Sequence, residues 1–151
     1  MSPDPGTPDR FAPRFAELAT FMRAPLARSL SEADIGIFGV PYDGALTNRP
    51  GARHGPREVR NQSSLIRAIN HATRVDPFSL ARVRDLGDVR LTQMFDIEAA
   101  HGEIEHFARD AVRAGILPLA IGGDHSISLP LLRAVAHDGP VALIHVDAHT
   151  D

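Results

Sequence analysis

The sequence predicts an α/β fold of three layers, in which a parallel β-sheet lies between two layers of helices. Short runs of β-branched and aliphatic residues recur along the chain, and segments with helical spacing of apolar residues separate them. Runs without polar alternation are typical of strands buried on both faces, and helical crossovers between them favour parallel pairing. The chemistry of such sheets is expected at the carboxyl ends of the strands.

Proline and glycine set the predicted boundaries of these elements. Pro41 ends the first apolar run, Pro56 occupies a first helical position, and Gly115 is a helix C-terminal cap. Residues 41–56 carry several glycines and are expected to form a loop. In chain order, we expect a helix within 11–30, a strand at 35–40, a helix over 56–72, a strand at 83–86, a helix over 95–114 with Ile97, Ile104, Phe107 and Val112 inward, a strand at 116–121, a helix over 126–136 and a strand at 141–146.

The length and charge of the chain limit its organisation and its partners. Its 151 residues suit one domain, which we place at 11–151, after a proline-rich tail at 1–10 that is expected to be disordered. The formal net charge is −3, so we expect no nucleic-acid partner. The cationic residues are all arginine, which excludes Schiff-base lysines and the lysine of phosphate-binding loops.

Cysteine is absent from the sequence, which excludes disulfides, thiolate nucleophiles and cysteine-based zinc or iron–sulfur sites. Any metal must therefore bind histidine and carboxylate side chains. There is also no apolar run long enough to cross a membrane and no apolar signal core near Met1. We expect a protein of the cytoplasm with no membrane partner.

Two strand ends carry groups that can bind a metal. The strand at 141–146 leads into Asp147, His149 and Asp151, whose i, i+2, i+4 spacing puts them on one face of an extended chain. The strand at 116–121 leads through two glycines to His125, which is expected to lie beside them. Two carboxylates within about 7 Å repel each other unless a cation lies between them. Oxygen ligands with imidazoles favour Mn²⁺ over zinc.

Other candidate groups have structural interpretations. His101 and His106 are five residues apart on a predicted helix, so they do not share a face, and we expect them on a solvated surface. We expect His145, inside the last strand, to be a hydrogen-bonded structural residue. The arginines of the glycine-rich loop either receive a substrate carboxylate or anchor the loop through salt bridges; they are Arg49, Arg53 and Arg57.

Several motifs resemble those of the ureohydrolases, the arginase and agmatinase family. Gly122-Gly-Asp-His-Ser126 matches the first metal motif of that family, and Asp147-Ala-His-Thr-Asp151 matches the second. The segments Gly39–Asp43 and Asn48–Arg57 are similar to the agmatinase branch, which includes guanidinopropionase and guanidinobutyrase. The resemblance runs from about Phe11 to Asp151.

The resemblance implies an arginase-like α/β fold and a dinuclear Mn²⁺ site at which hydroxide attacks a guanidinium carbon, giving urea and an amine. Asp147 would bridge the two ions, His125 and Asp151 would bind one, and His149 the other, with Asp124 a neighbour. The substrate would be agmatine or a guanidino acid, and the complete protein would be a homo-oligomer. The catalytic and substrate-binding residues are not identified.

The family's proteins are longer and supply further ligands in a later motif, so the resemblance covers their N-terminal half. We therefore expect this chain to be the N-terminal part of a ureohydrolase. The alternative is a non-catalytic remnant or interaction module that folds by pairing an open sheet edge. A doubly wound nucleotide or phosphate binder is disfavoured because the glycine fingerprint and the lysine are missing.

Overall fold

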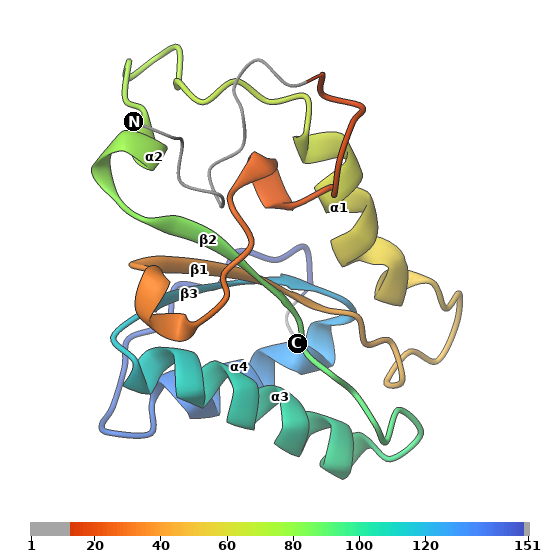
Figure 1. The fold of residues 1–151 in the computed structure, drawn as a ribbon. Coiled ribbons are helices and arrows are strands. Elements are labelled where there is room, and N and C mark those ends of the chain that lie inside the picture. The colour runs from red at the N-terminus through yellow and green to blue at the C-terminus, as the bar shows by residue number, and fades with distance from the viewer. Residues whose placement is uncertain (1–12, 150–151) are drawn as a thin grey trace.

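The computed structural model describes residues 13–149, whose centre is a three-stranded parallel sheet between helices (Figure 1). Helices α3 and α4 cover one face of the sheet and α1 lies over the other. The predicted three-layer α/β arrangement is thereby confirmed. The elements are β1 (Ile35–Val40), β2 (Val83–Asp88), β3 (Leu117–Gly122), α1 (Gly55–Ser63), α2 (Pro77–Leu80), α3 (Ile97–Arg113), α4 (Ser128–Val135) and the 3₁₀ turns η1 (Phe21–Arg23), η2 (Leu30–Glu32), η3 (Ala52–His54) and η4 (His125–Ile127).

The strand order β2-β1-β3 places the first strand at the centre of the sheet. Ile35 of β1 aligns with Val83 of β2 and with Leu117 of β3, and Val40 aligns with Gly122 at the other end. The carboxyl ends of β1 and β3 therefore meet at one edge. The loops that follow Val40 and Gly122 lie side by side as a result.

Both faces of β1 are buried, as its unbroken apolar pattern predicts. Phe38 and Val40 pack against α3 and α4, and the Phe38 and Phe107 rings lie 5.0 Å apart between centroids. Ile37, on the opposite face, packs against Phe21. Successive strand residues point to opposite faces, so the central strand joins two separate apolar clusters.

Helix α3 matches the predicted range and packs on the sheet through three alanines and one isoleucine. It begins at Asp96, whose side chain accepts the Ala99 N–H at 3.0 Å, and is followed by Gly115 with a φ of +77°. One expectation is wrong, because Ile97 is 44% exposed in the first turn, one residue after the cap. The fully buried side of α3 consists of Ala100, Ile104, Ala108 and Ala111.

The helix predicted over 56–72 ends at Ser63 instead. The hydroxyl of Ser63 bonds the Arg60 carbonyl, and that of Ser64 bonds the Asn61 carbonyl. Serine side chains that bond nearby backbone carbonyls compete with helix continuation, and this terminates α1. The helical spacing of Ile66 and Ile69 beyond it has no structural counterpart.

The helix predicted within 11–30 is also wrong over its described part, 13–30, where two 3₁₀ turns are the helical elements. Met22 and Arg23 have φ values of +54° and +58°, which are incompatible with a right-handed helix. The Phe21 N–H donates to Asp85 on β2 at 3.0 Å. Long-range bonding of this segment therefore outweighs its local helical pattern.

A buried charge cluster attaches α1 and η1 to β2. Arg60 donates from Nε and Nη2 to Asp85 at 2.8 and 3.0 Å, and from Nη1 to Asp88 at 2.6 Å. Asp85 is fully buried and also accepts the Gly87 N–H. The Arg60 guanidinium lies 3.9 Å from the Phe21 ring centroid. These contacts orient α1, and with it the loop that precedes it.

The strand predicted at 141–146 is not formed, and this segment does not pair with β3 through backbone hydrogen bonds. Ile144 and Val146 are 90% and 91% exposed, and Leu117 and Leu119 of β3 are 63% and 45% exposed. A strand needs a hydrogen-bonded neighbour, and a run that is apolar on both faces needs cover on both. Within residues 13–149 nothing supplies that cover.

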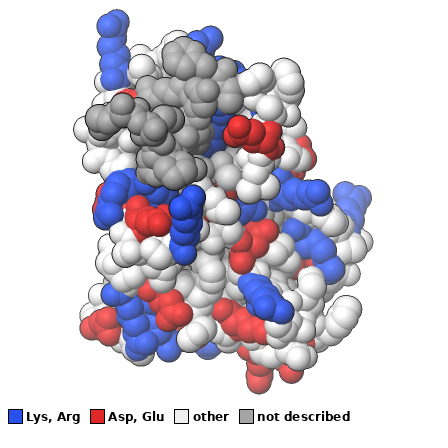
Figure 2. All heavy atoms as spheres, in the orientation of Figure 1, with Lys and Arg blue, Asp and Glu red and all other residues white. Residues whose placement is uncertain are grey.

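Acidic and basic side chains alternate over the face shown in Figure 2, without a single field of one sign. No helix in the described part of the chain is both long and apolar enough to span a bilayer. The predicted tail at 1–10 lies outside the described residues.

Candidate metal centre

His125 is delivered by a glycine turn at the end of β3. Gly123 has a φ of +78°, and a Cβ there would lie 2.5 Å from the Val40 carbonyl oxygen and 2.6 Å from that of Tyr42. Any side chain would clash with this backbone, so the chain can pass under the end of β1 only with glycine at 123. The predicted tight exit before His125 is therefore present.

Asp124 is a structural group, in keeping with its expected place beside the ligands. Its carboxylate is buried and accepts the Ala45 N–H at 3.0 Å on Oδ2. Oδ1 accepts the N–H of Ser126 at 3.0 Å and its hydroxyl at 2.6 Å. Asp124 thus caps η4 and joins the exit of β3 to the loop that follows β1.

His125, His145 and Asp147 form the candidate metal centre. Each offers one ligand atom, and these three atoms lie within 4.8 Å of one another. The two imidazole rings are stacked, with 5.2 Å between centroids and 6° between planes, and His145 Nε2 lies 3.5 Å from Asp147 Oδ2. Two imidazoles and a carboxylate converging on solvent form a donor set that can bind a divalent transition-metal ion.

His149 contacts Asp147 but lies outside this group of three. Its backbone N–H donates to Asp147 Oδ1 at 2.8 Å, its Nδ1 is 3.3 Å from the same oxygen, and its side chain is 79% exposed. The N–H of His149 holds the pKa of Asp147 below its usual value, and the neighbouring imidazoles act in the same direction. The fourth predicted ligand, Asp151, lies outside the described residues.

His145, which the sequence interpretation treated as a structural strand residue, lies in this group with His125 and Asp147. The sequence contains a signal for this position, because His145 lies two residues before Asp147 and continues the two-residue spacing of the predicted ligands. An extended chain therefore places His145 on their face. The structure brings it to His125 even though the strand itself is not formed.

His101 is not on a solvated surface as expected, whereas His106, with its side chain 78% exposed, is. His101 is partly buried, with its Nε2 3.1 Å from the Ser126 hydroxyl and its ring edge-on to Tyr42 at 5.9 Å. Burial lowers its pKa, which favours the neutral imidazole. The helical spacing separated the two histidines correctly, but it could not show that α3 turns His101 toward η4.

The glycine-rich loop is anchored by an ion pair. Arg53 donates to Asp43, which also accepts the Gly51 N–H at 2.7 Å and the Arg53 N–H at 3.2 Å. The Arg53 side chain lowers the pKa of Asp43 to about 2. For Arg53 the anchoring interpretation is confirmed, while Arg49 and Arg57 are exposed. Exposed His54 is outside the metal cluster.

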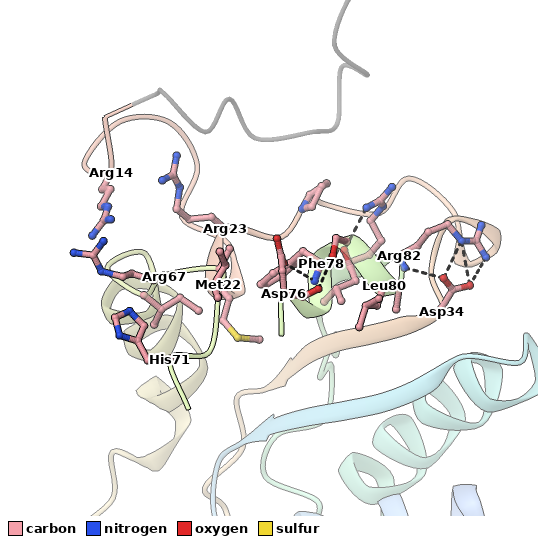
Figure 3. Close-up of a pocket in the computed structure, with 18 residues that line it drawn as sticks. Arg14, Met22, Arg23, Asp34, Arg67, His71, Asp76, Phe78, Leu80 and Arg82 are labelled. Atoms are coloured by element: carbon pink, nitrogen blue, oxygen red, sulfur yellow. Dashed lines mark hydrogen bonds and ion pairs between the residues drawn. The ribbon is translucent and has the colours of Figure 1, made fainter. Parts of the chain in front are cut away.

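A cavity of about 840 Å³ lies at the opposite end of the sheet, beside the amino ends of β1 and β2 (Figure 3). Arg14, Arg67 and Phe78 are among its lining residues, and Arg82 in its wall is bonded to Asp34. None of the predicted ligands lines it. In parallel α/β sheets the chemistry lies at the carboxyl ends of the strands, so we assign the candidate site to the histidine cluster rather than to this cavity.

Comparison with known proteins gives the family of this chain. The arginase family profile matches residues 33–151. Guanidinopropionase from Pseudomonas aeruginosa is 48% identical over 139 residues, which are 92% of this chain and 43% of that protein.

Solved structures show the same relationship. Proclavaminate amidino hydrolase from Streptomyces clavuligerus superposes with a TM-score of 0.86 at 39% identity, over 92% of this chain and 47% of that one. Formiminoglutamase from Trypanosoma cruzi, solved with Mn²⁺, has a TM-score of 0.66 at 30% identity, over 78% of this chain and 40% of that one. This chain thus spans less than half the length of these relatives. With a profile match over residues 33–151 and a shared fold, the chain belongs to the arginase family.

Proposed function

We propose that this chain is the N-terminal part of a Mn²⁺-dependent hydrolase of guanidino compounds. The observation that supports the proposal most directly is the convergence of His125, His145 and Asp147 within 4.8 Å at the carboxyl end of the sheet. Carboxylates and imidazoles must be deprotonated to bind a metal, and the Asp147 carboxyl, like an ordinary aspartate, is charged at neutral pH. His149 and Asp151 would complete this chain's share of the ligands.

The proposed reaction is hydrolysis of the guanidinium group. A C–O bond forms between water and the guanidinium carbon, the C–N bond to the departing amine breaks, and both water protons end on that nitrogen, giving urea and an ammonium group. Bound Mn²⁺ would lower the pKa of water so that hydroxide is available near neutral pH.

For the substrate, we propose a small guanidino compound, either agmatine or a guanidino acid. The two differ at the far end, where agmatine has a cation and the acids have a carboxylate. Arg53 is already paired with Asp43, so we do not assign it as the carboxylate receptor. If the acid is the substrate, exposed Arg49 and Arg57 are the loop cations that remain to bind it.

The proposal is tested by measuring retained manganese after loading with Mn²⁺ and desalting. We expect the wild-type chain to retain the metal and Asp147→Asn to lose it, because the amide carries no charge. Asp138→Asn is the matched control, since Asp138 is 83% exposed and lies outside the cluster. Equal manganese content in the wild type and Asp147→Asn would overturn the assignment. Urea release from agmatine, guanidinopropionate and guanidinobutyrate then tests the reaction with the complete protein.

A second candidate function is a non-catalytic interaction module. The exposed apolar residues of β3 and of 141–146 favour it, because an uncovered sheet edge is a template for pairing with another chain. This alternative predicts association that increases with concentration in light scattering, and no manganese retention. A monodisperse monomer over a wide concentration range would contradict it.

A further inference from the structure

His101 lies in the first part of α3, outside the candidate metal centre, yet it contacts the residue next to His125. Its Nε2 is 3.1 Å from the hydroxyl of Ser126, and this hydroxyl donates to Asp124 Oδ1 at 2.6 Å. A serine hydroxyl has one proton, which is already directed to Asp124. His101 Nε2 must therefore be the donor to Ser126, so the chain of donors runs from His101 through Ser126 to the buried carboxylate.

The carboxylate at the end of this chain fixes the turn that carries His125. Asp124 accepts the Ser126 N–H and the Ala45 N–H, and its own N–H donates to the Tyr42 carbonyl at 2.8 Å. His125 is the residue between Asp124 and Ser126, and both of its neighbours are thus fixed by hydrogen bonds. Its own side chain projects to solvent.

His101 is itself held on two sides, so it can transmit position. The buried ring of Tyr42 contacts it edge-on at 5.9 Å between centroids. Helix α3 is packed against α4, which continues directly from η4 (Figure 1). The histidine therefore joins α3 to the first residues after β3 at the point where the chain leaves the sheet.

We propose that His101 is a positioning residue that holds the η4 turn, through Ser126 and Asp124, in the conformation that presents His125 to a metal ion. This rests on the proposed function, since it assumes that His125 binds Mn²⁺. Groups that orient a ligand without touching the metal commonly change metal affinity by about 10- to 100-fold. A residue that served packing alone would alter stability and leave affinity unchanged.

The test compares substitutions at His101 by Mn²⁺ titration, followed by electron paramagnetic resonance, and by thermal unfolding without metal. His101→Phe keeps an aromatic ring against Tyr42 but removes the donor, so we expect Mn²⁺ affinity to fall about tenfold or more. His101→Gln keeps an N–H donor and is expected to restore affinity to within about threefold of wild type. His106→Phe is the matched control on the same helix, with an exposed side chain, and should leave affinity unchanged.

Ser126→Ala provides a second route to the same answer if His101→Phe does not fold. This substitution removes the middle group of the hydrogen-bond chain from His101 to Asp124, so we expect a loss of Mn²⁺ affinity similar to that of His101→Phe. The double variant, with both substitutions, should bind Mn²⁺ no more weakly than either single variant. Wild-type affinity in both His101→Phe and Ser126→Ala would overturn the inference and leave the proposed function intact. Equal losses in His101→Phe and His101→Gln would overturn it as well, because the donor would then be irrelevant. Absence of Mn²⁺ binding in the wild type would instead overturn the proposed function, and the inference with it.

Discussion

Replacing Arg60 tests whether the buried charge cluster beneath α1 stabilises the fold. Arg60→Leu removes two bonds to the fully buried Asp85 and one to Asp88. The Phe21 and Gly87 N–H groups still bond Asp85, so its carboxylate keeps part of its solvation. Breaking one partner of a buried ion pair costs about 3–5 kcal/mol, and these remaining donors place the loss near the lower end, about 3 kcal/mol.

The assay is urea unfolding followed by far-ultraviolet circular dichroism. With a denaturant dependence of about 1.5 kcal/mol per molar for a domain of this size, a loss of about 3 kcal/mol lowers the midpoint by about 2 M. Arg60→Lys should fall between the variant and the wild type, because lysine keeps the charge but not the two parallel bonds. If Arg60→Leu and Arg60→Lys change the slope of unfolding free energy against urea concentration by the same amount, the substitutions have altered the unfolded state instead.

Arg82 provides the matched control, because it pairs with Asp34 in a similar two-bond geometry on the surface. Its side chain is 55% exposed and that of Asp34 is 46% exposed, so water screens the pair. Arg82→Leu should leave the urea midpoint within experimental scatter. The reasoning is refuted if Arg60→Leu costs less than about 1 kcal/mol, or if the two arginine variants are equally destabilised.

Three further predictions concern the loop anchor, the glycine turn and the α3 cap. Arg53 lowers the pKa of Asp43 to about 2. The charged Asp43 carboxylate therefore stabilises the fold above pH 3.8, its ordinary pKa, and this contribution is lost as the pH falls toward 2. Asp43→Asn should reduce the change in unfolding free energy between pH 3.8 and pH 2. Gly123→Ala forces a Cβ to 2.5 Å from a backbone oxygen, and we expect a lower unfolding temperature together with lost manganese retention. Asp96→Ala removes the cap of α3 and should cost about 1 kcal/mol in urea unfolding, whereas Asp96→Asn should preserve most of the stability.

The sequence predicted the central strand, where a continuous apolar run indicates burial on both faces of the sheet. Residues 35–40 form the central strand because Ile37 and Phe38 each find an apolar layer on their own side. The run at 141–146 has the same pattern and forms no strand, since a pattern shows that a segment is suited to burial and does not supply its neighbours. Arg60 and Asp85 gave no sequence signal, because their pairing depends on a contact between α1 and β2.

The candidate site was predictable where backbone geometry restricts the residue type. Gly123 has to be glycine, and this fixes the place of His125 whatever follows it in the chain. The association of His125 with His145 depends instead on how the chain returns after α4, which no local rule describes. His101 was separated correctly from His106 by helical geometry, but its burial depends on the packing of α3 against η4.

His145, Asp147 and His149 occupy alternate positions, and this spacing links the metal centre to the predicted strand at 141–146, which is not formed. An extended chain would place all three on one face, but the Asp147 carboxylate accepts the His149 N–H and the chain bends at 148–149. Binding of a metal by all three side chains from one face of an extended segment would open this bend, and the free edge of β3 is available among the described residues to pair with the straightened segment. Mn²⁺ should therefore slow hydrogen exchange of the amides at 141–149 while leaving those of α1 unchanged. If Mn²⁺ binds and exchange in this segment stays fast, the ligands are gathered without strand formation and the coupling is wrong.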